Sequence, residues 1–592
     1  VGGYLGRRIP ATFKGFAPKL PRVKRGGGGA QLLLCFMALC YCLLSVFFMG
    51  RNHLVTKGPV RSCMKGIKSI RVRNLRSFGC DNEFIPLKKL NILVGKNSCG
   101  KSTFLRTFPL LRQSVQADTR SPILWYGSFV DFGDFNTAVN FNAKEVMFDF
   151  DMDVKVPISE DDYTDGILVS SFVTGFDDGR SGVVTFPLIF TLGVGREGGD
   201  EVASRIKLCI GGVEVEIVYK ESVLISLQLK VRGCVLSEGF EGREVAKKGK
   251  LIPTDFTSEK ISSGSKSSHW FLHRIRIVYR RMLLDYVSSL HHHNKKREII
   301  AEVLKRLPLS PKVKVAENLR KLFSADRAFV NNLQINKDEI VDIVFAFLIG
   351  INLHKILASI DQSLSGFYSG VRYLGPVRAS AERFYRYQDL QVAEIDHTGS
   401  NLPMVLNSLN WLDRELLNDW IKESFGFELL LKNTGSHYAL SIREAASSEF
   451  HNVSDMGFGY SQLLPIIVSI WLENNSKSSL SRSIFNRQGG KQLVLAIEQP
   501  ELHLHPQLQH MFGRAIAKIA KLQDSDFCFV LETHSKHIID AIGECIEEKE
   551  LENEDVSVAL FEKNSSGYTD TRLSSFDESG YLVNWPAGFL SP

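Results

Sequence analysis

The alternation of hydrophobic and polar positions changes character several times along the first two thirds of the chain. Residues 66–95 alternate with the period of two β-strands, and an amphipathic helix is predicted over 102–114. Residues 144–235 hold β-branched and aromatic runs broken by Gly and Asp, which predicts antiparallel strands. The polar, Lys- and Ser-rich stretch 238–265 is expected to be a loop, and residues 269–347 take a helical period. The pattern therefore predicts a β-rich arm followed by an inserted helical subdomain.

Short strands and helices alternate in the last third of the chain. Residues 371–378 are strand-like, and 404–425 are predicted to form one helix. A hairpin is expected around Asn433–Gly435, and an apolar helix is expected from Ser461. Residues 490–540 have the pattern strand, helix, strand, helix. This succession is typical of a sheet covered by helices.

The net charge of the chain is +7, but it is unevenly distributed. Residues 1–63 contain ten Lys or Arg and no Asp or Glu, so residues 64–592 carry a net charge of −3. The body therefore has no global signature of nucleic-acid binding, although a local basic groove is compatible with it. The cysteines of the body are scattered and form no C-x-x-C pair. This usage indicates a reducing, cytoplasmic compartment and argues against a Cys-rich zinc site.

The first 63 residues allow two interpretations. Residues 30–50 are 21 uncharged residues, which is long enough to span a bilayer. They would then anchor the chain in the inner membrane. The other interpretation is that the natural start is Met64, because the chain changes character there and opens a strand. The cytoplasmic localisation follows from this second interpretation.

A Gly-rich run between a predicted strand and a predicted helix carries the clearest chemistry. It matches G-x-x-x-x-G-K-[ST], where the glycines let backbone N–H groups converge on phosphates. Lys101 is expected to reach the β- and γ-phosphates of ATP, and the Ser102 hydroxyl is expected to bind Mg²⁺. The residues predicted to bind the nucleotide here are Gly95, Asn97, Ser98, Cys99, Gly100, Lys101, Ser102 and Thr103.

A second run supplies the carboxylate that ATP hydrolysis requires. Residues 492–498 form an apolar strand that ends in Glu498, as a Walker B strand does. Glu498 is predicted to hold Mg²⁺ together with Ser102. The sequence then continues as Q-P-E-L-H-L-H-P.

Five runs together resemble one family. They are N-I-L-V-G-K-N-S-C-G-K-S-T-F-L-R at 91–106, Y-L-G-P-V-R at 373–378, D-M-G-F-G-Y-S-Q-L-L-P at 455–465, I-E-Q-P-E-L-H-L-H-P at 497–506 and E-T-H-S at 532–535, with N-W-P-A-G-F at 584–589 as a tail. These runs are similar to the RecF/OLD-like branch of ABC-type AAA family ATPases, which are related to SMC proteins and occur in DNA repair and in prokaryotic anti-phage defence. The resemblance covers most of 64–592 and is weakest over 140–360.

The resemblance implies a fold and a mode of action. The fold is α/β, an ABC-type P-loop NTPase head of two lobes with a mixed sheet flanked by helices. ATP binding would drive a homodimer, in which Gly459, Ser461 and Gln462 complete the site of the opposite subunit. His534 would contact the γ-phosphate. The effector would be a separate protein, such as a nuclease, and DNA is a further candidate partner.

Four segments follow from these observations. Residues 1–63 are an extension, 64–237 a P-loop lobe with the β-rich arm, 238–365 a mostly helical insertion, and 366–592 the lobe that carries the remaining motifs. The predicted function is an ATP-hydrolysing ATPase that controls an effector. The alternatives are a DNA-repair ATPase that clamps DNA and a non-hydrolysing scaffold gated by ATP.

One position departs from the pattern of many ABC ATPases. Gln499 stands where a catalytic Glu usually follows the Walker B acid. A Gln cannot accept a proton at neutral pH, although it can orient water. Glu501 and Glu532 are alternative bases. Glu498, Gln499, Glu501 and His534 are therefore the candidate catalytic residues, and slow hydrolysis is expected.

Several residues have a structural alternative. Ser461 is compatible with a plain N-cap of the apolar helix. His503 and His505 alternate like metal ligands, but without a third ligand they are expected to form a loop at the dimer interface. The run His291–His293 is expected to be a solvated loop. Arg378 is a candidate for phosphate binding or for a structural role, and Gln113 and Gln116 are weak candidates for a Q-loop role.

Overall fold

A seven-stranded sheet carries the strands of the predicted nucleotide site. Its order is β12-β17-β18-β3-β19-β20-β21. The first five strands are parallel, and the last two are antiparallel to their neighbours, so the sheet is mixed as predicted. The bounds are β3 (Leu90–Gly95), β12 (Val371–Leu374), β17 (Leu493–Glu498), β18 (Phe527–Glu532), β19 (Val556–Lys563), β20 (Thr569–Phe576) and β21 (Leu582–Val583).

A ten-stranded antiparallel sheet forms the predicted β-rich arm. Its order is β11-β10-β8-β7-β6-β5-β4-β1-β2, with β9 paired to β8. The bounds are β1 (Ile67–Arg73), β2 (Ile85–Pro86), β4 (Glu145–Pro157), β5 (Val183–Arg196), β6 (Val202–Ile210), β7 (Val213–Lys220), β8 (Val223–Val231), β9 (Cys234–Glu238), β10 (Glu244–Lys248) and β11 (Pro253–Ser258). The two strands predicted within 66–95 therefore enter different sheets, β1 the arm and β3 the seven-stranded sheet.

The interpretation of 238–265 as a loop is wrong for the part that the structure describes. β10 and β11 lie there and extend the arm from the edge of β8. The carboxylate of Asp361 accepts hydrogen bonds from the backbone N–H groups of Lys250, Leu251 and Ile252 at 2.7, 2.7 and 3.0 Å. This acid fixes the connection between the two strands, so backbone pairing decides the structure although the side chains are polar.

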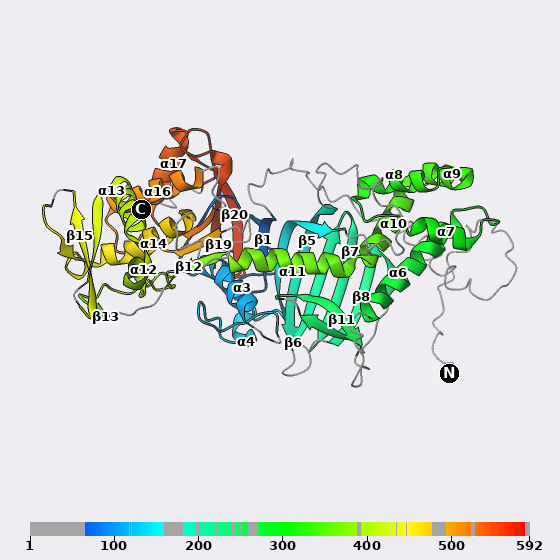
Figure 1. The fold of residues 1–592 in the computed structure, drawn as a ribbon, viewed down its shortest axis with the longest axis horizontal. Helices are drawn as coiled ribbons and strands as arrows, with labels where there is room; N and C mark the ends of the chain where they lie inside the picture. The colour runs from blue at the N-terminus through cyan, green and yellow to red at the C-terminus, as the bar shows by residue number, and fades with distance from the viewer. Residues whose placement is uncertain are drawn as a thin grey trace. The chain divides into compact units, whose positions relative to one another are not determined.

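Helices link the two sheets and extend the arm. α11 (Leu353–Ser369) contacts β4 and β11 of the arm as well as α3, and it runs along the arm sheet in Figure 1. The boundary predicted at 365 and 366 falls inside this helix. The other helices of this part are α2 (Lys101–Leu105), α3 (Thr107–Gln116), α4 (Phe135–Ala138), α6 (Trp270–Ser289), α7 (Arg297–Leu304), α8 (Lys312–Leu322), α9 (Arg327–Ile335) and α10 (Lys337–Ile351).

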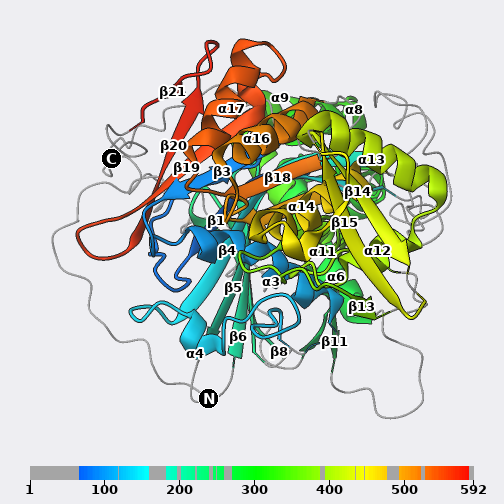
Figure 2. The same ribbon diagram turned by 90° about the vertical axis from the view of Figure 1, so that its left-hand side faces the viewer.

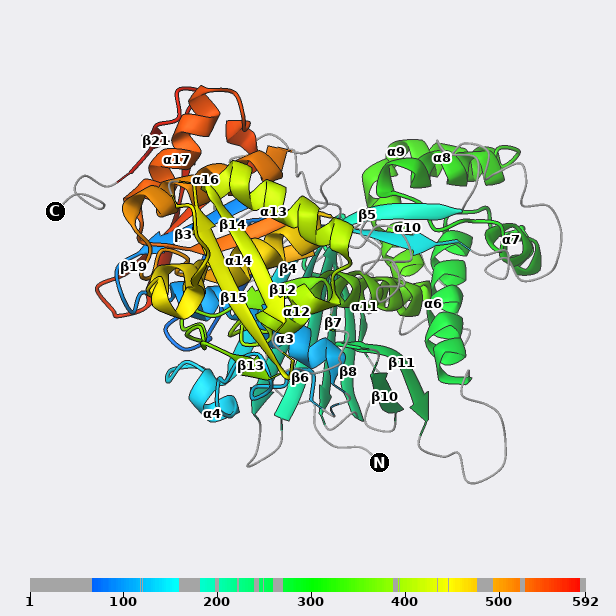
Figure 3. The same cartoon turned by 60° about the vertical axis from the view of Figure 1, so that its left-hand side comes forward.

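The C-terminal lobe packs helices against the seven-stranded sheet. Figure 2 shows α14, α16 and α17 grouped around β18 and β3, and Figure 3 shows the β14–β15 hairpin beside α12 and α13. The bounds are α12 (Leu402–Ser408), α13 (Trp411–Phe425), α14 (Phe458–Asn474), α16 (Pro506–Lys521), α17 (Lys536–Glu547), β13 (Tyr385–Arg386), β14 (Phe427–Asn433), β15 (His437–Glu444), β16 (His451–Asn452) and the 3-10 turns Val453–Asp455 and Asn553–Asp555. The predicted hairpin and the alternation over 490–540 are confirmed.

The single helix predicted over 404–425 is two helices, α12 and α13. The side chain of Asn410 accepts a hydrogen bond from the backbone N–H of Asp413 at 2.8 Å and so caps a new helix. An Asn at this position satisfies one of the free N–H groups of a helix start. The helical period of the sequence passes through this break and does not reveal it.

The structure is a computed structural model that describes residues 66–585 except for 118, 120, 159–181, 197–201, 221–222, 239–243, 249, 259–269, 387–391, 393, 434, 446, 476–492 and 522–526. All described residues belong to the compact unit Lys57–Pro592. The apolar segment 30–50 lies outside them. Within the described residues no single helix is long and apolar enough to cross a membrane. Taken as a pair, α10 and α11, which are bent by 68° relative to each other, reach the length and apolar composition of a membrane span.

Candidate nucleotide-binding site

The Gly-rich loop lies between the end of β3 and the start of α2. A Cβ atom at Gly95 would lie 2.4 Å from the carbonyl oxygen of Phe561 on the neighbouring β19, so a larger residue does not fit. Gly100 has a φ of 100° at the N-cap of α2, a conformation that favours glycine. Asn97 and Ser98 are exposed at the tip of the loop. The loop therefore has the strand–loop–helix context that the phosphate-binding motif requires.

Lys101 lies at the centre of this loop. Its Nζ donates hydrogen bonds of 2.9 Å to the carbonyl oxygen of Gly95 and 2.8 Å to that of Lys96. Desolvation by burial lowers the pKa of Lys101, while the charges of Glu532 and Glu501 act in the opposite direction. The ammonium group is thus held by backbone carbonyl oxygens of the same loop whose N–H groups would be directed at phosphates.

Glu498 ends β17 and is engaged on both oxygens. Arg106 binds it with two hydrogen bonds, from Nε to Oε1 at 2.7 Å and from Nη2 to Oε2 at 2.9 Å. The hydroxyl of Tyr373 donates a further hydrogen bond of 2.9 Å to Oε1. The hydrogen bond to Glu498 raises the pKa of Arg106. This fork-to-fork pair is a strong and geometrically specific contact.

Arg106 also interrupts the helix predicted over 102–114. α2 ends at Leu105 and α3 begins at Thr107, with Arg106 between them. The structure thus splits this segment at the residue that reaches Glu498. Neither Arg106 nor Tyr373 was singled out from the sequence, although both lie in the quoted runs 91–106 and 373–378.

Glu532 ends β18 and is the acid next to the P-loop serine. The hydroxyl of Ser102 donates a hydrogen bond of 2.8 Å to Oε1 of Glu532. The buried Oε2 has no hydrogen-bond partner within the described residues. Burial, together with the negative charge of Glu498, its register partner on β17, raises the pKa of Glu532 to about 7. The structure therefore brings Ser102 to Glu532 and leaves Glu498 with Arg106.

The residues after Glu498 form a tight turn. Gln499 has a φ of 44°, and its backbone N–H donates to the carbonyl oxygen of Glu532 at 2.8 Å. The carboxylate of Glu501 accepts hydrogen bonds from the Thr533 hydroxyl at 2.9 Å and the His534 backbone N–H at 2.7 Å. Burial raises the pKa of Glu501, and these hydrogen bonds oppose the rise. Glu501 therefore ties the turn after β17 to the turn after β18.

The remaining predicted catalytic residue lies at the same edge of the sheet. His534 is exposed and follows β18. Partial burial lowers its pKa, and the charge of Lys101 lowers it further. Ligands bind at the carboxyl ends of parallel strands in open α/β sheets. The structure thus gathers the P-loop, Glu498, Gln499, Glu501 and His534 at one edge.

Arg378 is buried behind Glu498. Its Nη2 donates a hydrogen bond of 2.8 Å to the backbone oxygen of Glu498, while Nε and Nη1 have no partner within the described residues. Burial lowers the pKa of Arg378 to about 10. The side chain of Gln462 holds the backbone of Arg378 with two hydrogen bonds. Its Oε1 accepts from the Arg378 N–H at 3.3 Å, and its Nε2 donates to the Arg378 carbonyl oxygen at 3.2 Å. Arg378 therefore links β17 and α14.

The interpretation of Ser461 as an N-cap is wrong. α14 begins at Phe458 with Gly457 at the N-cap position, so Ser461 lies inside the helix and donates a hydrogen bond of 2.8 Å to the carbonyl oxygen of Phe458. Gly459 lies at the helix start, where a Cβ atom would come within 3.0 Å of the His503 carbonyl oxygen. Of the three residues predicted to serve an opposite subunit, Ser461 and Gln462 are buried and Gly459 is partly exposed.

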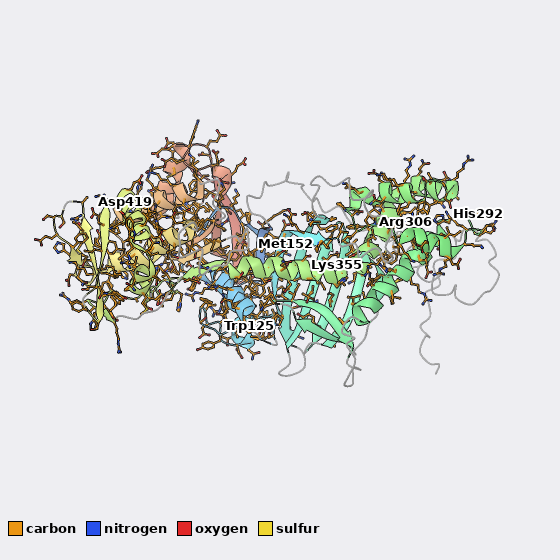
Figure 4. All side chains as sticks on the ribbon, in the orientation of Figure 1. Trp125, Met152, His292, Arg306, Lys355 and Asp419 are labelled. Atoms are coloured by element: carbon orange, nitrogen blue, oxygen red, sulfur yellow. The ribbon has the colours of Figure 1, made fainter. Side chains whose placement is uncertain are left out.

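The histidine runs do not form metal clusters in the part of the chain that the structure describes. His503 and His505 are exposed beside the start of α14, where His503 lies 5.9 Å from the ring of Phe458. The interpretation of His291–His293 as a solvated loop is wrong for His291, which is buried and lies 2.8 Å from Asp326. His292 and His293 are exposed, and Figure 4 shows His292 beside α7, far from the sheet edge described above.

The remaining candidates have structural surroundings. Gln113 donates a hydrogen bond of 2.6 Å to the carbonyl oxygen of Leu124 and thereby holds a loop, while Gln116 is exposed at the end of α3. Cys99 is buried, and its carbonyl oxygen accepts a hydrogen bond of 3.0 Å from Thr569. Thr103 lies partly buried in α2. The tail run 584–589 lies mostly outside the described residues.

A P-loop that follows a parallel strand, beside two strands ending in acids, defines a P-loop nucleotide-binding protein. The sequence pattern of the AAA ATPase domain family matches residues 64–164 and 245–539. Because this match covers more than half of the chain, the chain belongs to that family.

Similarity to individual proteins is more limited. The chain is 26% identical over 183 residues to endonuclease GajA of Bacillus cereus (strain HuB5-5), a match that covers 26% of this chain and 25% of that protein. The chain thus spans about a quarter of the length of this curated relative. The family match and the GajA match confirm the predicted RecF/OLD-like, ABC-type class.

Two solved structures are similar over most of their length. One is the SMC head bound to the C-terminal winged-helix domain of ScpA, with a TM-score of 0.31 and 9% identity over 87% of this chain and 98% of that one. The other is RecF-ATPrS of the RecFOR pathway, with a TM-score of 0.23 and 12% identity over 86% and 100%.

Proposed function

We propose that the chain is an ATP-hydrolysing switch that dimerises on ATP and controls a separate effector, in anti-phage defence. The observation that carries this proposal is the group formed by the P-loop, Lys101, Ser102 and the two strand-end acids Glu498 and Glu532. Membership of the AAA ATPase domain family supports nucleotide binding and ATPase activity in general. The finer steps below rest on the geometry of this group.

The residues around Ser102 fit a bound Mg²⁺. Ser102 offers hydroxyl lone pairs, and Oε2 of Glu532 is a buried carboxylate oxygen without a partner in the described structure. Hard oxygen donors of this kind are the ligands that Mg²⁺ prefers. When bound, the ion would neutralise charge on the β- and γ-phosphates. Ser102 and Glu532 would hold it in this arrangement, and Glu498, the ligand predicted from the sequence, would join only after Arg106 turns away.

Water activation is assigned to the turn after β17. Each carboxylate oxygen of Glu501 already accepts one hydrogen bond, from Thr533 or from His534, so Glu501 serves to position His534 beside the P-loop. Gln499 stands next to Glu498 and is partly exposed. An amide there can orient a water molecule but cannot remove its proton. Hydrolysis by this arrangement would be slow, and the ATP-bound state would be long-lived.

The start of α14 is the proposed contact with a second copy of the chain. Phe458 is 62% exposed there, next to Gly459 and the ring of His503. A second copy of the chain would cover this aromatic side chain, a residue type that is enriched in the cores of protein interfaces. The free backbone N–H groups at this helix start would face the γ-phosphate of the other subunit's ATP.

The role in defence is inferred from similarity. The resemblance to RecF/OLD-like ATPases and the match to an endonuclease, GajA, both support a system in which an ATPase governs an effector. The match covers a quarter of GajA, so its nuclease activity is not assigned to this chain. The effector is proposed to be a separate protein.

Two measurements on the full chain test the proposal. Light scattering is expected to show a monomer without nucleotide and a dimer with ATP and Mg²⁺, and Lys101→Ala is expected to remain monomeric. Turnover is expected to be slow and to rise in Gln499→Glu, which restores a base at this position. A wild type that binds ATP without dimerising would refute the switch. A wild type that dimerises without turnover, alongside a hydrolysing Gln499→Glu variant, would establish the non-hydrolysing scaffold instead.

A further inference from the structure

The positive charge of the body is concentrated in one segment. Residues 270–337, which comprise α6 to α9 and the first residue of α10, contain fifteen Lys or Arg and five Asp or Glu, a net charge of +10. Because residues 64–592 carry −3 in total, the remainder of the body carries −13. The segment lies away from the nucleotide site, as the labels of Arg306 and His292 in Figure 4 show. Its charge therefore needs an explanation other than phosphate binding at the P-loop.

One acid joins two turns of this segment. Asp326, the N-cap of α9, accepts a hydrogen bond of 2.6 Å from Nζ of Lys295 and lies 2.8 Å from Nδ1 of His291. His291 stacks on Phe329 and packs edge-on against Phe323, with ring centroids 4.6 and 4.7 Å apart. These contacts fix the turn between α6 and α7 against the turn between α8 and α9.

The joined turns expose five bases, which we call the basic corner: Lys296, Arg297, Arg320, Lys321 and Arg327. Arg297 pairs with Asp285, and Lys321 pairs with Glu317 at 2.7 Å. Lys296, Arg320 and Arg327 form no ion pair with any described residue. Since Asp326 is already occupied by Lys295 and His291, the corner presents uncompensated positive charge to solvent.

Basic side chains of the arm sheet differ from those of the corner, because they form ion pairs with acidic side chains. Arg71 and Arg73 both bind Asp149, at 2.9 and 2.7 Å. Arg205 lies 3.5 Å from both Glu145 and Glu216. Such paired side chains stabilise the sheet and leave little net field. The basic corner is thus distinguished by unpaired charge as well as by the number of bases.

The chemistry of the corner fits a polyphosphate backbone. Duplex DNA presents about one negative charge per 1.7 Å of its axis, and Lys and Arg bind these phosphates irrespective of sequence. Asn294, Ser324 and Asn331 are exposed among the bases and can donate hydrogen bonds to phosphate oxygens. We propose that the basic corner binds the phosphate backbone of duplex nucleic acid without reading its sequence.

The aromatic residues beside the corner favour a duplex over a single strand. Phe323 and Phe329 are buried against His291, at 3% and 0% exposure, so neither can stack on an unpaired base. Single-strand binding relies on exposed aromatic platforms. The proposal does not depend on ATP hydrolysis, because the corner and the P-loop share no residue.

The test is binding of a labelled random-sequence DNA duplex to the full chain over a series of salt concentrations. One variant neutralises four corner bases, Lys296→Gln, Arg320→Gln, Lys321→Gln and Arg327→Gln. Its control carries the same charge change at exposed bases of the C-terminal lobe, Lys518→Gln, Lys521→Gln, Lys563→Gln and Arg572→Gln. Circular dichroism and ATP-induced thermal stabilisation check that both variants are folded. If the corner variant is unfolded, the single variant Arg320→Gln takes its place.

The wild type is expected to bind with an affinity that falls steeply with salt. The corner variant is expected to bind at least tenfold more weakly, with a salt slope reduced by about 3 to 4 because each lost phosphate contact removes about 0.9. The control variant should resemble the wild type. An RNA duplex in a parallel arm identifies which duplex is preferred. Equal losses in both variants, or binding to phosphatidylserine vesicles but not to any duplex, would overturn the proposal.

Discussion

The hydroxyl of Ser102 donates its hydrogen bond to Glu532 at the end of β18, and Glu498 at the end of β17, the acid predicted from the sequence to hold Mg²⁺, is bound by Arg106 instead. This relationship follows from the strand order, because β18 lies between β17 and the P-loop strand β3. The acid on the middle strand is the nearer neighbour of the loop. The proposed assignment of Mg²⁺ to Ser102 and Glu532 rests on this order.

Replacing Glu532 is therefore expected to weaken the binding of Mg²⁺. Glu532→Gln keeps the size of the side chain and an acceptor for Ser102 but removes the charge that would attract Mg²⁺. ATP-induced thermal stabilisation should require about tenfold more Mg²⁺ than in the wild type. Glu562→Gln, an acid of the same sheet whose carboxylate pairs with Arg572, is the control. An unchanged Mg²⁺ requirement in Glu532→Gln would indicate that Glu498, and not Glu532, binds the metal.

Removing Arg106 is expected to destabilise the fold as well as the site. In Arg106→Ala the side chain of Glu498, 2% exposed, would keep only Tyr373 as a partner among the described residues. Leaving a buried carboxylate without its cation costs about 3 kcal/mol or more. Urea denaturation should show this loss for the single variant. The double variant with Glu498→Gln should recover part of it, and a double variant as unstable as the single one would show that the pair is not the cause.

Because of the tight contact at Gly95, replacing this residue by alanine is expected to destabilise the fold. Because the added Cβ would lie 2.4 Å from the backbone oxygen of Phe561, β3 and β19 must separate, at a cost of about 1 to 3 kcal/mol. Gly95→Ala should lower the melting temperature and abolish ATP binding. Gly366→Ala in α11, where a Cβ meets nothing within 4 Å, should be neutral or slightly stabilising. Equal behaviour of the two variants would contradict this account.

The joined turns of the helical segment are expected to lose stability in acid. Burial lowers the pKa of His291, with Lys295 acting in the same direction. Burial would raise the pKa of Asp326, but hydrogen bonds from Lys295, Phe329 N–H and His291 outweigh it and lower the pKa. In the folded protein the pKa of His291 lies below the ordinary 6.5 and the pKa of Asp326 lies below the ordinary 3.8. The stability that each group contributes is therefore complete above its ordinary pKa, and it is lost as the pH falls through its folded-state pKa.

The urea midpoint is the measurement for this prediction. In the wild type it should decline as the pH falls below about 6.5, since the unfolded chain takes up a proton that folded His291 resists. His291→Phe keeps an aromatic ring against Phe323 and Phe329 and should remove this first decline. A variant that retains the wild-type pH dependence would show that another group titrates.

Much of the fold could be predicted from local pattern. The P-loop has fixed spacing, so Gly95 to Ser102 were identified without any knowledge of neighbours, and strand ends with acids placed Glu498 at the same edge. The family pattern singled out His534 and the segment around the start of α14, although that helix begins at Phe458 and not at Ser461. These features depend on short stretches of sequence, which is why the sequence carries them.

Other features depend on contacts between distant residues. The hydrogen bond from Ser102 to Glu532 requires the strand order, and the pair of Arg106 with Glu498 joins residues 392 positions apart. β10 and β11 have polar sequences and exist because β8 offers an edge and Asp361 binds their connection. His291 is buried because Asp326 and two phenylalanines surround it, which a run of three histidines does not reveal. The boundaries between the four predicted segments stay predictions.

The central claim is that the P-loop hydrolyses ATP. The most direct measurement is phosphate release by the full chain with Mg²⁺ and ATP, comparing Lys101→Ala with Lys96→Ala, a neighbouring exposed lysine outside the fixed positions of the motif. The account predicts slow turnover in the wild type and in Lys96→Ala, and its loss in Lys101→Ala. Turnover that persists in Lys101→Ala, or that falls equally in both variants, would contradict it.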